Sequence, residues 1–187
     1  MVFETGRLLV RKASPDDNDL ILSLWTDPRV MANVGFPQGL KTTRQEILAR
    51  IEQDTRELSP FNSLLVAELK SDCMVIGQCL MHLPDEDGIA STDIKLLPAY
   101  WGQKYGSEIK RGLVDYLFSN LDCLAVDATP NVENIASIRM QESVGAVRIG
   151  EAVHTFPESM DEYSQPVHHY IYRVYRAAWE QLTKNDR

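Results

Sequence analysis

The order of secondary-structure signals predicts an α+β (mixed α/β) fold, with a mostly antiparallel central sheet and helices on both faces. Three strand-like apolar segments follow one another between residues 64 and 97, a pattern typical of antiparallel pairing. A strand–helix–strand unit then runs from Asp93 to Ala128, which requires a parallel pair and a right-handed crossover. Two further strands, 147–155 and 167–175, are expected to complete the sheet.

The N-terminal part predicts one strand and two helices before the sheet continues. Residues 7–11 predict a first strand. Ser14-Pro15 followed by two acids predicts the start of a helix, and that helix is expected to end near Asp27-Pro28. Thr43 with Glu46 forms a capping-box pattern, which predicts a second helix. The three strands are then expected at 64–69, 74–81 and 93–97.

The C-terminal part contains the longest amphipathic pattern. Apolar residues recur at helical spacing from Tyr105 to Leu117, which predicts about four helical turns. A strand at 121–128 and a helix at 134–144 follow, with Gly145 as the C-terminal stop of the helix. A short helix is expected at 177–182.

Length and composition favour one globular domain spanning 1–187. The chain has 187 residues and a net charge of −8, which argues against binding to a nucleic-acid backbone and is compatible with a cationic amine partner. No apolar run reaches the ~20 residues of a membrane span, and the first residues show no signal peptide, so we expect a cytoplasmic protein. The three cysteines and four histidines lack zinc-site spacing, so no metal is expected. Oligomeric state is not readable.

The most informative segment is Pro98–Glu108, which connects a predicted strand to the long helix. Gly102 and Gly106 lie four residues apart at the start of that helix. Free backbone N–H groups and the helix dipole at this point would form an anion site. The alternative is a plain glycine-containing turn without a ligand, because two glycines alone match neither the Walker nor the Rossmann pattern.

The segment Trp101-Gly102-x-x-Tyr105-Gly106-Ser107-Glu108 resembles the coenzyme A pyrophosphate loop of the GNAT superfamily of N-acetyltransferases. The narrower resemblance is to its ribosomal-protein alanine acetyltransferase-like (RimJ/RimL-type) branch. Three further segments resemble that branch in the same order: Glu4-Thr5-x-Arg7-Leu8-x-Val10-Arg11, Asp27-Pro28-x-Val30 with Gly35, and Asn134-x-x-Ser137 through Gly145. Together they extend from Glu4 to about Trp179.

The resemblance implies acetyl-CoA as the donor and assigns residues to it. Backbone groups of Ile94 and Leu96 would face the acetyl-pantetheine arm, and Asn134 would hydrogen-bond that arm where the two parallel strands splay. The pyrophosphate would be held by the loop residues Gly102, Gln103, Lys104, Tyr105, Gly106 and Ser107. Asn134 has an alternative role as a helix N-cap, for which Asn131 competes.

The sequence departs from the family at two positions. Lys104 stands where a glycine is usual, and its ammonium would either pair with a phosphate or crowd the loop. Gln141 stands where many members carry a tyrosine that acts as an acid, although the RimJ/RimL-type branch often lacks that tyrosine too.

The expected reaction is direct attack of an amine on a thioester. It needs removal of a proton from the amine, a donor to the oxyanion and a hydrogen bond to the leaving thiolate. Ser137, one turn after Asn134, is the candidate donor to the thiolate, with a bond to a helix carbonyl as its alternative role. Asp93 and Glu151 are the candidate general bases; both are alternatively plain surface acids, and a water chain would also serve.

Three functions remain open at this point. The first is acetylation of a protein N-terminal α-amine, and the second is acetylation of a small-molecule amine such as a polyamine or an antibiotic. The third is a non-catalytic module that binds acyl-CoA.

Overall fold

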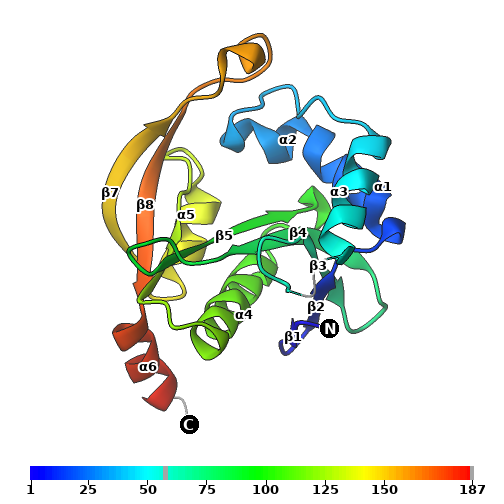
Figure 1. Cartoon of the computed structure of the whole chain (residues 1–187). Helices are drawn as coiled ribbons and strands as arrows, with labels where there is room; N and C mark the ends of the chain where they lie inside the picture. The colour runs from blue at the N-terminus through cyan, green and yellow to red at the C-terminus, as the bar shows by residue number, and fades with distance from the viewer. Residues whose placement is uncertain (57–58, 186–187) are drawn as a thin grey trace.

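One eight-stranded sheet runs through the computed structural model, which describes residues 1–56 and 59–185 (Figure 1). The strand order is β1-β2-β3-β4-β5-β6-β8-β7, and each pair is antiparallel except β5–β6, which is parallel as predicted. The strands are β1 Phe3–Glu4, β2 Leu8–Lys12, β3 Leu65–Leu69, β4 Val75–His82, β5 Ile89–Leu96, β6 Ala125–Ala128, β7 Val147–His154 and β8 Val167–Tyr175.

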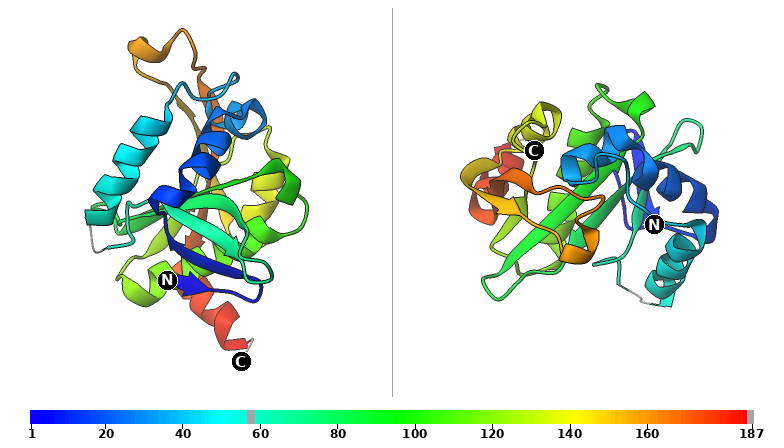
Figure 2. Two further views of the ribbon diagram at one scale, coloured as in Figure 1. Left: turned by 90° about the vertical axis from the view of Figure 1, so that its right-hand side faces the viewer. Right: turned by 90° about the horizontal axis from the view of Figure 1, so that it is seen from above.

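Helices cover both faces of the sheet, which confirms the predicted fold class (Figure 2). The helices are α1 Asn18–Thr26, α2 Pro28–Met31, α3 Arg44–Arg56, α4 Tyr105–Asn120, α5 Ile135–Glu142 and α6 Arg176–Asn185. Short 3-10 turns lie at η1 Pro15–Asp17, η2 Ala32–Val34, η3 Pro98–Tyr100 and η4 Glu158–Met160.

Two apolar cores lie between the sheet and the helices on its two faces. On one face α4 buries Ile109, Leu113 and Leu117 against the strands. On the other face α1 and α3 bury Ile21, Ile47 and Ile51 against β3. The period of two along a strand divides its side chains between these cores, so β5 turns Ile94 and Leu96 toward α4 and the intervening residues toward α1.

Several element boundaries differ from the sequence prediction: the two-residue strand β1 was not predicted, and α6 extends beyond the predicted 177–182. β5 begins at Ile89 rather than Asp93, because the Asp85 carboxylate accepts the N–H of Ile89 (2.9 Å) and closes the turn at Gly88. β6 is shorter than predicted and begins at Ala125. Pro28 starts the short helix α2 instead of only ending α1, with the Asp27 side chain accepting the N–H of Arg29 (2.8 Å).

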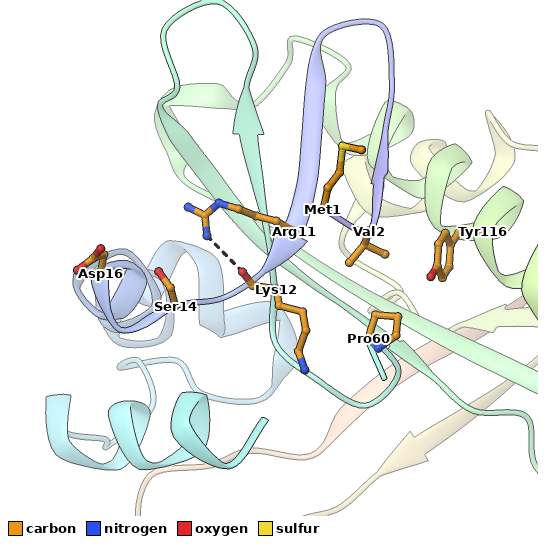
Figure 3. A pocket seen from close by; sticks show the side chains of 8 residues that line it. All are labelled: Met1, Val2, Arg11, Lys12, Ser14, Asp16, Pro60 and Tyr116. Atoms are coloured by element: carbon orange, nitrogen blue, oxygen red, sulfur yellow. Dashed lines mark hydrogen bonds between the residues drawn. The ribbon is translucent and has the colours of Figure 1, made fainter. Parts of the chain in front are cut away.

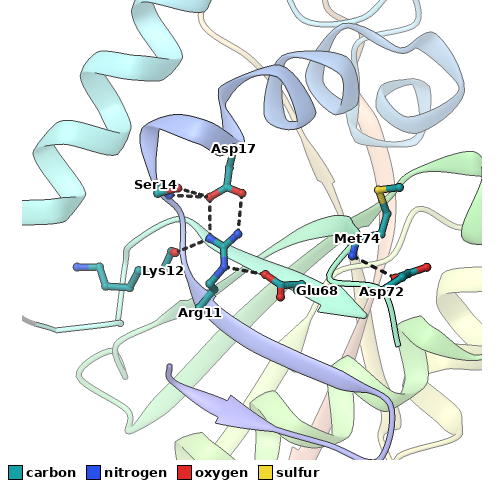
Figure 4. Close-up of polar contacts among 7 residues, drawn as sticks. All are labelled: Arg11, Lys12, Ser14, Asp17, Glu68, Asp72 and Met74. Carbon is teal, nitrogen blue, oxygen red and sulfur yellow. Dashed lines mark hydrogen bonds and ion pairs between the residues drawn. The ribbon is translucent and has the colours of Figure 1, made fainter. Parts of the chain in front are cut away.

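A network around Arg11 ties β2 to the start of α1 (Figure 4). The guanidinium donates to both carboxylate oxygens of Asp17 (2.7 and 3.0 Å) and to Glu68 of β3 (3.1 Å). Burial disfavours the charged form of Asp17, but the bonds from Arg11 and Ser14 outweigh it and lower the pKa of that carboxyl. This contact fixes how α1 sits on the sheet.

The β7–β8 hairpin reaches over to the segment after α2, as Figure 1 shows. The Phe156 ring packs edge-on against Phe36 with centroids 4.9 Å apart, and the N–H of Gln165 donates to the carbonyl of Gly35 (2.8 Å). A Cβ on Gly35 would lie 2.4 Å from Phe156, so only glycine permits this contact. The tip of the hairpin is therefore held against the segment that follows α2.

Candidate active site

The loop before α4 has the backbone conformation of an anion site. Gly102 and Lys104 both have a positive φ (75° and 65°), so the chain turns sharply and directs successive N–H groups outward. The first N–H to bond within the helix is that of Glu108, which donates to the carbonyl of Lys104 (3.1 Å). Among the described residues, no acceptor is recorded for the backbone N–H groups of residues 102–107.

The positive φ at Lys104 gives a physical reason for the glycine that the family usually has there. A side chain in this conformation costs about 1–2 kcal/mol relative to glycine. The Lys104 side chain is exposed, and it forms the N-cap of α4 by position without a side-chain bond. The Lys104 side chain therefore extends from the loop into solvent.

The N-terminal segment clamps the first turn of α4. The Glu108 carboxylate accepts the Thr5 hydroxyl (2.5 Å), the Arg7 backbone N–H (2.8 Å) and the Arg7 Nε (2.7 Å). Arg7 also donates to the Gln103 carbonyl (3.2 Å) and lies over the Tyr105 ring (4.2 Å). Burial opposes ionisation of Glu108, but these bonds outweigh it and lower the pKa of its carboxyl. Sequence reasoning noted Thr5 and Arg7 only as part of a resemblance and missed this role.

The edge of β5 that faces β6 is open over most of its length. The parallel pairing covers only three residue pairs and ends at Ser91↔Asp127. Although β5 is the fifth of eight strands, residues 91–96 are all half-buried rather than buried. A strand in the middle of a sheet is normally covered, so this exposure indicates a gap between β5 and β6 beyond Ser91.

The backbone groups named from the sequence lie along this open edge. The N–H of Leu97 donates to Ile76 of β4 (3.0 Å), and the period of two then turns the N–H groups of Ile94 and Leu96 away from β4. The Trp101 indole donates to the Leu96 carbonyl (2.9 Å) and so pins the anion loop to the end of the strand. The loop and the open edge are therefore continuous.

Helix α5 lines the other side of this region. The Asn134 Oδ1 accepts the Ser137 N–H (3.0 Å), so Asn134 is the N-cap of α5 and its amide nitrogen stays available for another role. Asn131 is occupied differently, since it bonds to Glu133 and to Asn33 near α2. A Cβ on Gly106 would lie 3.0 Å from the Met140 sulfur, so α4 and α5 pack closely at the loop.

Two hydroxyls join these helices, and Gln141 is buried nearby on α5. The Ser143 and Ser107 hydroxyls are hydrogen-bonded to each other (2.9 Å), and the Ser143 hydroxyl also lies 2.7 Å from the Met140 carbonyl. Gln141 is 3% exposed, and no residue in the described part of the chain is recorded as a hydrogen-bond partner of its Oε1. The position that carries a tyrosine acid in many relatives is thus a buried amide here.

The structure does not bring the two candidate bases together. Asp93 lies on the α1 side of β5 and forms an ion pair with Lys95. Glu151 lies on the edge strand β7, where it pairs with Arg148 (2.6 Å) and lies 3.7 Å from His168. β7 is three positions from β5 in the strand order, which corresponds to roughly 14 Å.

A separate pocket of about 680 Å³ opens at the far end of β2 (Figure 3). It lies beside Lys12, whereas the anion loop is held at the other end of β2 by Arg7. This pocket is therefore not part of the site around α4. Its lining residues are Met1, Val2, Arg11, Lys12, Ser14, Asp16, Pro60 and Tyr116.

Comparison with known proteins decides the family. Residues 7–147 match the family model described as an acetyltransferase (GNAT) domain. The chain belongs to the GNAT acetyltransferase family. It is therefore an acyltransferase, and acetyl-CoA is the acetyl donor of acetyltransferases of this family.

Individual relatives agree with this assignment. An uncharacterized N-acetyltransferase of Bacillus licheniformis, p20, is 26% identical over 147 residues, which covers 78% of this chain and 82% of the relative. The fold is similar to that of a spermidine N-acetyltransferase from Vibrio cholerae solved with CoA and spermine (TM-score 0.75, 17% identity, 94% and 99% of the two chains covered). It is also similar to an aminoglycoside acetyltransferase solved with coenzyme A (TM-score 0.69, 15% identity, 94% and 99% covered).

Within residues 1–56 and 59–185, no group of three or more His, Cys, Asp or Glu side chains is arranged to hold a metal ion. In the same part of the chain, no helix combines the length and the apolar character needed to cross a bilayer.

Proposed function

We propose that this chain transfers the acetyl group of acetyl-CoA to the α-amine at a protein N-terminus, as the narrower RimJ/RimL-type resemblance implies. Binding of the coenzyme is supported by two neighbouring features of the structure, the anion loop and the open edge of β5. The free N–H groups of residues 102–107 adjoin the open edge of β5, where the N–H groups of Ile94 and Leu96 point away from β4. This arrangement fits an anionic head followed by an extended amide-containing arm.

Each part of the coenzyme then has named partners. The pyrophosphate would accept from the N–H groups between Gly102 and Ser107, at the positive end of α4. The Lys104 ammonium lies on the solvent side, where it would pair with a phosphate. The amide nitrogen of Asn134 would donate to the arm, while its oxygen keeps the cap of α5.

The surroundings of the two candidate bases favour an acceptor amine of low pKa. Asp93 is engaged in an ion pair with Lys95 and Glu151 in one with Arg148, so both candidate carboxylates are already occupied by a cation. An α-amine has a pKa near 8, so a useful fraction is neutral at physiological pH without a strong base, whereas a lysine-type amine has a pKa of about 10.4. The protein therefore suits an acceptor with the lower pKa, with water carrying the proton away.

A small polycationic amine is the second candidate. The hairpin that reaches over the α1 face of β5 carries Glu158, Asp161 and Glu162, and the chain has a net charge of −8. A solved structure of similar fold is a spermidine N-acetyltransferase bound to CoA and spermine. Acidic groups around the acceptor face would attract such a cation over long range.

One assay separates the two candidates. Free thiol release from acetyl-CoA is measured with a mixed library of peptides that have free N-termini, and separately with a panel of polyamines and aminoglycosides. Mass spectrometry of the products then locates the acetyl group. We expect acetylated peptide N-termini; turnover with the polyamine panel alone would replace the first candidate by the second.

A further test asks whether the named residues hold the coenzyme. Acetyl-CoA is titrated during thermal unfolding, and a ligand that binds the folded state raises Tm by mass action. No shift at millimolar acetyl-CoA would remove the loop of residues 102–107 from the account. A cytoplasmic location stays a prediction from the sequence.

A further inference from the structure

Lys110, on the second turn of α4, is the largest fully buried side chain of the molecule's described part. It is 1% exposed and lies among the apolar residues through which α4 packs on the sheet. Lysine is almost never fully buried unless it is paired, because desolvating an ammonium is costly. Its place on a helix face that otherwise carries Ile109, Leu113 and Val114 therefore calls for a function.

The recorded partner of this ammonium is a neutral hydroxyl. Lys110 Nζ donates to the Thr92 Oγ1 of β5 over 2.6 Å. A hydroxyl that accepts one hydrogen bond keeps its own proton to donate elsewhere. The pair Lys110–Thr92 thus presents one O–H donor backed by a cation.

The charged groups around the pair do not neutralise Lys110. From β6, Asp127 acts on the ammonium, but both its oxygens accept from Arg173 of β8 (2.7 and 2.8 Å). From β5, Asp93 and Lys95 lie on the opposite face and pair with each other. Burial lowers the pKa of Lys110 from 10.5 to about 7, although Asp127 acts in the other direction. The amine can therefore gain and lose a proton near neutral pH.

Thr92 occupies a special place on β5. The last residue pair that joins β5 to β6 is Ser91↔Asp127, and Thr92 is the next residue of β5. The open edge of β5 therefore begins at Thr92. Leu96, at the other end, adjoins the anion loop through the Trp101 indole. Leu96 is four positions along the strand from Thr92, which is roughly 13 Å. An extended arm that begins at the loop and follows this edge over that distance would reach Thr92.

We propose that Thr92 and Lys110 form a proton relay to the sulfur that leaves when the acetyl group is transferred. This inference rests on the proposed acetyl-CoA-dependent function and adds two residues to it. Thr92 touches the reacting sulfur and is the catalytic residue. Lys110 acts through Thr92 and supplies the proton.

In the proposed step, one bond forms, one bond breaks and each proton has a stated acceptor. The neutral acceptor amine attacks the thioester carbon, so a C–N bond forms and the C–S bond breaks with its electron pair remaining on sulfur. The sulfur takes the hydroxyl proton of Thr92 while Thr92 takes a proton from Lys110, and the product is a free thiol. The proton lost by the amine passes to water, and the buried Lys110 regains a proton through the Thr92 hydroxyl before the next turnover.

The test compares single and double variants in steady-state kinetics with saturating acetyl-CoA. Thr92→Val keeps the shape of the side chain without the hydroxyl, and Lys110→Met keeps its length without the amine. Because a general acid contributes typically 10²–10⁴-fold, we expect each variant to lower kcat by about 10²-fold. The double variant should be no slower than either single one, because both remove the same relay. The conservative variant Thr92→Ser should keep most of the activity.

Two readouts separate a relay from a structural role. The Kd for coenzyme A, measured by calorimetry, should stay within about twofold in both variants, because the anion loop and Leu96 are unchanged. The decline of wild-type kcat at high pH, where Lys110 is neutral, should be absent in Lys110→Met. Arg111→Met is the matched control on the same helix: its side chain is exposed and lies over the Trp179 ring, and kcat should not change.

Several results would overturn the relay. The relay would be wrong if Thr92→Val or Lys110→Met kept the wild-type kcat. It would also be wrong if only Ser137→Ala, which removes the donor named from the sequence, lowered kcat. These failures are distinct from failure of the proposed function, which would appear as no thiol release by the wild-type protein with any amine.

Discussion

Replacing Lys110 by methionine should stabilise the folded protein at neutral pH. In the folded state the ammonium is buried, whereas in the unfolded chain it is hydrated and has its ordinary pKa. A fall in pKa from 10.5 to about 7 corresponds to a destabilisation of about 5 kcal/mol when both states carry the proton. Methionine has a similar length and removes this cost, but it leaves the Thr92 hydroxyl without its donor at a cost of about 1 kcal/mol.

The pH dependence follows from the direction of the shift. Below pH 7 both the folded and the unfolded state are protonated at Lys110, so the cost is complete. Between pH 7 and 10.5 the unfolded state binds a proton that the folded state lacks, so wild-type stability rises with pH. The cost should be about 2 kcal/mol at pH 9 and vanish above pH 10.5.

Thermal and urea unfolding of both proteins between pH 6 and pH 10 measures this difference. A net gain of about 4 kcal/mol corresponds to a Tm increase of roughly 10 °C at pH 6.5 for a chain of this size. Arg111→Met, which removes an exposed cation, should change stability by less than about 1 kcal/mol at every pH. A difference between Lys110→Met and wild type that is constant over this pH range would refute the argument, because it would show that no proton is linked to folding at Lys110.

Three further predictions concern the loop, the cap of α5 and the Arg11 network. Lys104→Ala and Lys104→Gly should both raise the acetyl-CoA Kd measured by calorimetry roughly two- to fivefold, because both remove the cation. Only Lys104→Gly should also raise Tm, since glycine relieves the strain of the positive φ. Tighter binding by Lys104→Gly would mean that the lysine side chain crowds the loop instead. Asn134→Asp keeps the oxygen that caps α5 but removes the amide donor, so it should weaken acetyl-CoA binding without lowering Tm; unchanged binding would leave Asn134 a cap only. Arg11→Met leaves the Asp17 carboxylate buried without its cation, so the free energy of unfolding measured in urea at pH 7 should fall by about 3 kcal/mol. This deficit should shrink as the pH falls below 3.8, because the carboxylate is then protonated. A deficit that persists unchanged at pH 3 would contradict the prediction.

Much of the fold could be predicted because local signals and tertiary packing agree. The capping box of Thr43 and Glu46 is present, with the Thr43 N–H donating to Glu46 (2.8 Å), and the 3.6-residue period of α4 matches its buried face. Pro28 was less predictable, since the same proline that ends one helix is also a good first residue for the next. The early start of β5 depends on an aspartate side chain closing a turn, which a count of apolar residues does not detect.

The conformation of the loop proposed to hold the coenzyme could be predicted more fully than the positions of the side chains proposed for catalysis. Backbone N–H groups depend on where glycines fall along the chain, and that information is local. Catalytic side chains depend on which elements meet in three dimensions. Asp93 and Glu151 are close neither in sequence nor in the strand order, whereas Thr92 and Lys110 come from different elements and meet only because α4 crosses under β5. A lysine in an apolar helix face was the available sequence signal, and the helical period would have placed it toward the core.

The clamp on Glu108 explains how an anion site can have an acid in its first turn. A free carboxylate at this position would repel a pyrophosphate bound to the neighbouring N–H groups. Here the Glu108 carboxylate is held by Thr5 and Arg7, and the charge of Arg7 cancels that of Glu108. The same guanidinium bonds to the carbonyl of Gln103 and lies over the Tyr105 ring, so one side chain both neutralises the acid and fixes the loop. The N-terminal segment and the loop therefore act as one structural unit, although about a hundred residues separate them in the chain.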